Sequence, residues 1–167
     1  MPEPEPIDEK TLLLATLHAQ RAHVLGVLEG LPDEQLRRPV LPSGWSCLAL
    51  VHHLAVDVER FWFRAVLAGE QVELHDGDGG WRVPEGMPAA AVLELYRDEA
   101  RRADAVIAAG GLEDGPAWWP DALFHGLPVR DLRRLLLAVT TETATHAGHL
   151  DAVRELIDGR TWLVLTD

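Results

Sequence analysis

The sequence has a single cysteine and no long apolar run, and each absence excludes a class of protein. Cys47 alone cannot form an internal disulfide, which fits a reducing compartment. No stretch approaches the ~18 consecutive apolar residues that a membrane-spanning helix needs. The start, MPEPEPIDEK, is acidic and lacks the basic and apolar regions of a signal peptide. We therefore expect a cytoplasmic protein that does not enter membranes.

Basic residues are also scarce, with 15 lysines and arginines against 27 acidic residues and a net charge of −12. A protein that follows a phosphate backbone needs a basic face. Here the basic residues form no run longer than pairs such as Arg37–Arg38 and Arg133–Arg134. The composition therefore predicts no nucleic-acid partner.

The 167 residues, 47% of them hydrophobic, fit one domain with a substantial core, preceded by residues 1–6 as a disordered tail. Apolar residues recur at helical spacing in four segments separated by Gly and Pro: 7–29, 47–68, 88–109 and about 128–158. Ser46 is a suitable N-cap for the second segment. The loop 70–87 shows only a weak hairpin pattern, and RTWLVLTD at the end is β-prone. These features predict an all-α four-helix bundle with long connecting loops.

The last helical segment carries polar residues within its apolar stripe. The stripe advances in steps of three and four, the spacing of a buried seam, through Leu132, Leu135, Val139, Glu142, His146, His149, Val153 and Leu156. At roughly 100° per residue, the acid and both histidines lie within about 60° of one another. We therefore expect all three to face the interior of the bundle.

A buried carboxylate needs a partner, and a divalent metal suits a carboxylate and imidazoles together. A third ligand could come from the second segment, where the apolar stripe leaves His53 nearer the core edge than His52. The residues of this stripe, which we expect to be buried, are Val51, Leu54, Val58, Phe61 and Ala65. Two other interpretations stay open at this point. The histidines could be hydrogen-bonded core residues, and Glu142 could pair with Arg21 of the first segment.

Two stretches, PSGWSCLALVHHLAVDVERFWF and ETATHAGHLDAVRELIDG, resemble the DinB/YfiT-like superfamily. The similarity is greatest to its mycothiol-dependent branch, which includes maleylpyruvate isomerase. This resemblance implies a four-helix bundle that holds one divalent metal, usually zinc or nickel. It assigns the ligands to His53, Glu142 and His146, with His149 lining the pocket or contacting a ligand. Asp57, one turn beyond His53, could orient that ring; Glu59 has no assigned role.

Three ligands leave an open coordination position, as in catalytic zinc sites. We expect a low-molecular-weight thiol such as mycothiol to be activated there and transferred to a small electrophile, or to assist its isomerisation. His149 or Asp57 would position or shuttle a proton, and Arg21 could contact a carboxylate of the thiol. The alternatives are a metal-dependent hydrolase and a non-catalytic metal- or partner-binding bundle. The expected assembly is a monomer or homodimer.

Other residues have simpler expected roles. Cys47 lies about 240° around the helix from His53 and is predicted to pack in the core. A di-iron site is excluded because a Glu-x-x-His motif is missing: residue 145 is a threonine. Trp118, Trp119 and Phe124 form either a pocket lid or a hydrophobic plug at one end of the bundle.

Overall fold

The computed structural model describes residues 7–121, 124 and 130–162. Four long helical rods dominate the fold: α1 (Glu9–Val27), α3 (Cys47–His53) with its direct continuation η1 (Leu54–Leu67), α4 (Ala89–Ala109) and α5 (Leu132–Asp158). A short helix, α2 (Asp33–Arg37), and a single 3₁₀ turn, η2 (Gly79–Trp81), lie in the connections. No strand occurs in these described ranges, so the predicted all-α bundle is confirmed. The hairpin that the weak pattern in 70–87 allowed does not form.

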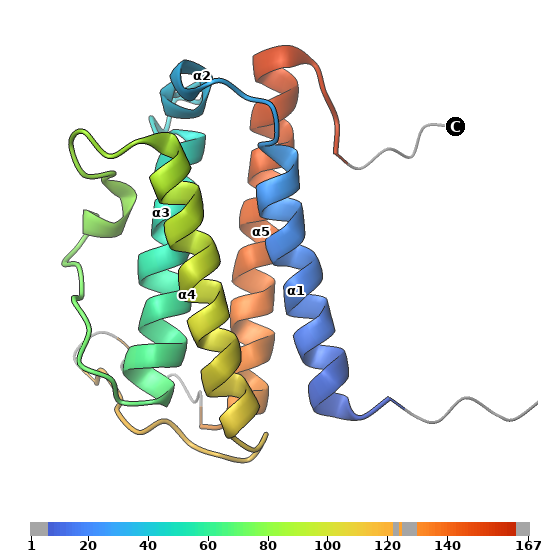
Figure 1. The fold of residues 1–167 in the computed structure, drawn as a ribbon, viewed down its shortest axis with the longest axis vertical. Helices are drawn as coiled ribbons and strands as arrows, with labels where there is room; N and C mark the ends of the chain where they lie inside the picture. The colour runs from blue at the N-terminus through green and yellow to red at the C-terminus, as the bar shows by residue number, and fades with distance from the viewer. Residues whose placement is uncertain (1–6, 122–123, 125–129, 163–167) are drawn as a thin grey trace, which may run out of the picture.

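A long connection joins the second and third rods and allows them to run in the same direction (Figure 1). The rod α3–η1 and helix α4 run in the same direction, and the segment that joins them passes back along the outside of the bundle. Helices α1 and α5 run the opposite way. α1 packs mainly against α5, and α4 packs mainly against η1. This arrangement places α3 and the middle of α5 next to each other, as a site shared by two helices requires.

Local sequence signals explain where the helices begin and end. Asp8, Ser46 and Asp131 each accept a hydrogen bond from a backbone N–H three residues on, which caps α1, α3 and α5. Gly159 ends α5 in the left-handed conformation, with a φ of 76° that favours glycine. The expected start of this helix near residue 128 lies outside the described residues, and the helix itself begins at Leu132. The predicted tail 1–6 and most of RTWLVLTD also lie outside them.

The second rod changes its winding at residue 54. Helix α3 is α-helical, whereas Leu54–Leu67 forms a π-helix, in which backbone bonds reach five residues back. Buried residues accordingly lie five positions apart in this stretch, as Leu54 and Glu59 do, and likewise Val58 and Phe63. This shift explains why Phe61, expected in the buried stripe, is only half-buried while Phe63 is fully buried.

One continuous apolar core joins the four rods. Cys47 is completely buried in it, as predicted, and burial raises the pKa of its thiol to about 11. Trp119 and Phe124 pack against Trp62, and the backbone N–H of Trp118 donates to the carbonyl of Val66 at the end of η1. These contacts favour the plug at one end of the bundle over a lid. None of the described helices is long and apolar enough to cross a membrane.

Candidate metal centre

Three side chains from two helices converge near the middle of the bundle. His53 is the last residue of α3, whereas Glu142 and His146 lie four residues apart on one face of α5. One ligand atom from each residue lies within 4.8 Å of the other two. His146 Nε2 is 3.0 Å from Glu142 Oε1, and His53 Nε2 is 3.9 Å from the same oxygen.

These separations suit a metal ion. Ligand atoms about 2.0–2.2 Å from a tetrahedral zinc lie about 3.4 Å from one another. The distances from Glu142 Oε1 to the two Nε2 atoms, 3.0 Å for His146 and 3.9 Å for His53, lie on either side of that value. Small side-chain movements would therefore bring these atoms to tetrahedral spacing. Two imidazoles and one carboxylate are also a donor set that zinc accepts, and they leave a fourth position free. The residues present therefore fit the metal that the sequence predicts.

Asp57 is hydrogen-bonded to the His53 ring, one helical turn away. Its Oδ2 lies 2.9 Å from His53 Nδ1. An ionised carboxylate can only accept this bond, so Nδ1 carries the ring proton and Nε2 presents its lone pair toward Glu142. This tautomer is the one that a ligand needs, and Asp57 selects it before any metal binds.

The structure corrects the expected orientation of the α5 stripe. Glu142 and His149 do not face the interior: the Glu142 side chain is 49% exposed and His149 is exposed as well. Thr143 occupies the buried position instead, and its hydroxyl donates to the carbonyl of Val139. The rest of the predicted seam is buried except at its end: Leu132, Leu135, Val139, His146 and Val153 are buried, Leu150 takes the place of His149, and Leu156 is exposed. The three candidate ligands therefore border the core and face a partly open side.

Burial makes His146 hard to protonate. Desolvation lowers the pKa of its imidazole, and the nearby rings of His53 and His149 lower it further, although Glu142 opposes this effect. The imidazole is thus neutral at neutral pH, which is the form that binds metals.

His149 lies beside the trio without joining it. Its Nδ1 is 3.5 Å from Nδ1 of His146, and its ring lies 6.2 Å from that of Trp45. This exposed imidazole can exchange protons with solvent next to a candidate ligand, so its position is compatible with the expected proton-shuttling role.

Arg21 and Glu59 form a separate pair. Nε and Nη2 of Arg21 donate to the two carboxylate oxygens of Glu59 at 2.7 and 2.6 Å, and Nη1 donates to Asp104. The alternative in which Arg21 pairs with Glu142 is therefore wrong. This pairing also gives Glu59 a clear structural role as the buried counterion of Arg21.

Trp81 is the residue at this site that sequence reasoning missed. It comes from η2, in the loop between the second and third rods, and its indole stacks on the His53 ring at 4.3 Å with an interplanar angle of 14°. The same indole contacts His146 edge-on, with centroids 5.6 Å apart. The only available signal was the sequence GDGGW, in which a pair of glycines permits a tight turn before a large aromatic residue.

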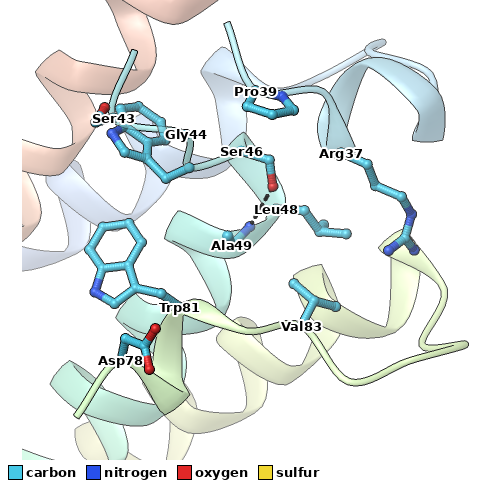
Figure 2. Close-up of a pocket in the computed structure, with 11 residues that line it drawn as sticks. Arg37, Pro39, Ser43, Gly44, Ser46, Leu48, Ala49, Asp78, Trp81 and Val83 are labelled. Atoms are coloured by element: carbon cyan, nitrogen blue, oxygen red, sulfur yellow. Dashed lines mark hydrogen bonds between the residues drawn. The ribbon is translucent and has the colours of Figure 1, made fainter. Parts of the chain in front are cut away.

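Trp81 also lines a cavity of about 540 Å³ (Figure 2). Its walls come from α2, from the N-terminal end of α3 and from the loop that carries Asp78, Trp81 and Val83. The three candidate ligands do not line it, but Trp81, which does, also contacts His53 and His146. Such a volume is within the range of small-molecule sites.

Comparison with known proteins gives one family. Residues 12–159 match the family model described as Mycothiol-S-transferase, which covers most of the chain and includes all three candidate ligands. A search of curated proteins finds no match.

Proposed function

Because the chain belongs to the mycothiol S-transferase family, we propose that it is a divalent-metal-dependent enzyme that joins mycothiol to a small electrophile. The observation that carries the metal dependence is the convergence of His53, Glu142 and His146 within 4.8 Å. We propose zinc as the ion, with nickel as the alternative, and the cytoplasm as the compartment, since low-molecular-weight thiols are kept reduced there.

The metal would supply a positive charge that lowers the pKa of the thiol, so that the sulfur is a thiolate at neutral pH. The chain's own residues have complementary tasks. Asp57 holds the proton of His53 on Nδ1, and the buried position of His146 keeps its imidazole neutral.

The proton that leaves the thiol needs an acceptor in contact with solvent. His149 is exposed and lies 3.5 Å from His146, so we propose that it takes this proton and releases it to water. The thiolate sulfur then forms a bond to the electrophilic carbon. In a substitution the leaving group departs with the electron pair; in an addition to a conjugated double bond the adjacent carbon takes up a proton. In an isomerisation assisted by the same thiol, the adduct would rotate about the carbon–carbon bond that has become single, and the thiolate and the added proton would then leave.

Metal analysis of the purified protein tests this assignment. We expect about one zinc per chain in the wild type, and loss of the metal in His53→Ala and His146→Ala. His149→Ala is the matched control, because it removes an imidazole from the same helix face but should retain the metal and lose turnover. Unchanged metal content in His146→Ala would contradict the ligand assignment.

Activity measurements separate the reaction classes. A panel of chromogenic electrophiles should be consumed only when mycothiol is present. Ester or amide hydrolysis without a thiol would instead identify a metal-dependent hydrolase. If the wild type binds metal with no open coordination position, or binds none after supplementation, a non-catalytic bundle is the better description.

A further inference from the structure

Two adjacent histidines of α3 contact different partners. His53 points toward Glu142, whereas His52 is buried, with 3% of its surface exposed, and its Nδ1–H donates to the backbone carbonyl of Gly80 at 2.7 Å. A carbonyl oxygen can only accept, so the ring must carry its proton on Nδ1. His52 therefore ties the turn η2 directly to the helix that carries the candidate ligand.

Gly80 allows this turn to approach the helix closely. A Cβ atom at this position would lie 1.7 Å from Oδ2 of Asp57, far inside van der Waals contact. The same Asp57 oxygen accepts the bond from His53 Nδ1. Any side chain at residue 80 would thus displace either the turn or the carboxylate that orients His53.

The next residue in the turn is Trp81, which covers one face of the His53 ring at 4.3 Å. Asp57 holds only one atom of that ring, Nδ1, through a hydrogen bond. The plane of the imidazole could still tilt about this hydrogen bond. A parallel indole prevents this tilting and keeps the ring plane constant. Together the two contacts fix the direction of the Nε2 lone pair.

We propose that Trp81 is a positioning residue for His53, and that His52 and Gly80 hold the indole in place. This inference rests on the proposed function, because it assumes that His53 is a metal ligand. It gives the loop between η1 and α4 a specific role: the loop supplies one face of the ligand's surroundings, although no residue of the loop is itself a candidate ligand.

Nuclear magnetic resonance of the metal-free protein tests how Trp81 is held, independently of any metal. The ring current of a stacked indole should shift the His53 imidazole protons upfield, and His53→Asn identifies their signals. In His52→Leu the donor to Gly80 is lost, and in Gly80→Ala the turn is displaced, so both variants should lose the upfield shift although Trp81 is still present. His52→Asn retains a donor near the position of Nδ1 and should restore it.

Circular dichroism checks that each of these variants is folded. Gly80→Ala leaves the buried helix residues unchanged, so it remains informative if His52→Leu does not fold. An upfield shift that persists in folded Gly80→Ala or His52→Leu would contradict the anchoring role.

Zinc affinity, measured by competition with a chromogenic chelator, tests the positioning role. Loss of a group that orients a ligand typically weakens metal binding by about 10- to 100-fold, and we expect a loss near the lower limit for Trp81→Ala. Trp81→Phe retains a stacking ring and should recover most of the affinity. Trp118→Ala, which removes an indole that packs on Phe61 instead, is the matched control and should bind zinc as the wild type does.

The outcomes separate the two proposals. If the wild type binds zinc, His146→Ala does not, and Trp81→Ala binds as tightly as the wild type, the positioning role is wrong and the proposed function stands. If the wild type binds no zinc, or His146→Ala binds it equally well, the metal centre is wrong and the positioning role is overturned with it.

Discussion

Replacing Arg21 by methionine would leave a carboxylate in the core without a counterion. The Arg21 side chain is 6% exposed, and Glu59 is completely buried. Both oxygens of Glu59 accept from this guanidinium, at 2.6 and 2.7 Å. Methionine is similar in length and apolar, so it fills the space but cannot donate or carry charge.

The size of the effect follows from how Glu59 can respond. The charged carboxylate cannot remain in the core alone, so in the folded variant it takes up a proton. Holding a carboxyl of ordinary pKa 4.5 in its neutral form at pH 7 costs about 3.4 kcal/mol. The lost hydrogen bonds add to this, and we expect the free energy of unfolding to fall by about 3–5 kcal/mol.

The same reasoning predicts a pH dependence with a definite sign. Burial already raises the pKa of Glu59, and removal of Arg21 takes away the group that opposes this shift. Above pH 4.5 the folded variant then holds a proton that the unfolded chain has released, so its stability falls as pH rises. At pH 5 the protonation cost is only about 1 kcal/mol, and the deficit of the variant should shrink accordingly.

Urea denaturation followed by circular dichroism, at pH 7 and pH 5, measures both quantities. Arg21→Met with Glu59→Leu should recover most of the stability, because it removes both charges. Asp104→Asn is the control for the third contact; Asp104 is 35% exposed, so we expect a loss of about 1 kcal/mol or less. A deficit below about 1 kcal/mol at pH 7, or one that does not change with pH, would refute the account of this pair. A raised KM for the thiol without lost stability would instead favour the expected contact between Arg21 and a carboxylate of the thiol.

Three further predictions concern other buried positions. Burial raises the pKa of Cys47 to about 11, so a disulfide reagent at pH 8 should label it only after unfolding in urea, and prompt labelling of the folded protein would contradict this. The Tyr96 hydroxyl is buried and has no hydrogen-bond partner among the described residues, so Tyr96→Phe should leave stability unchanged or raise it by up to about 1 kcal/mol; a larger loss would reveal a hidden partner. Gly148→Ala should stabilise α5 by about 1 kcal/mol because no atom lies within 4 Å of the new Cβ. In α1, by contrast, Gly26→Ala should stabilise its helix only together with Trp162→Ala, because the Trp162 indole otherwise lies 2.1 Å from the new Cβ.

The sequence was sufficient to predict the helices because their signals are local. Ser46 marks the start of the second rod at Cys47, and Gly159 marks the end of the last, as capping preferences predict. The proximity of His53 to Glu142 and His146 was also predictable, although the prediction depended on a family resemblance as much as on spacing. Helical periodicity alone left His52 and His53 as alternatives.

The errors have physical causes that a single sequence does not display. Glu142 and His149 were predicted to be buried because both fit a spacing of three and four residues. Thr143 takes the buried position instead, because its hydroxyl can donate to the backbone carbonyl of Val139 one turn earlier in the same helix. Phe61 was misplaced because nothing in its neighbourhood signals the change to π-helical winding. Trp81 was missed because its contact with His53 depends on a loop whose path is fixed by tertiary contacts.

The change of winding at residue 54 also determines how a shortened or lengthened chain would respond. Deleting one residue between 60 and 66 would favour ordinary α-helical turns and rotate everything after the deletion by about 100° relative to His53. The contact of η1 with the aromatic plug would lose its registration, while His53, Asp57 and Glu59, upstream of the deletion, would keep their places. Insertions and deletions after Glu59 should therefore be tolerated by the metal ligands but not by the opposite end of the rod.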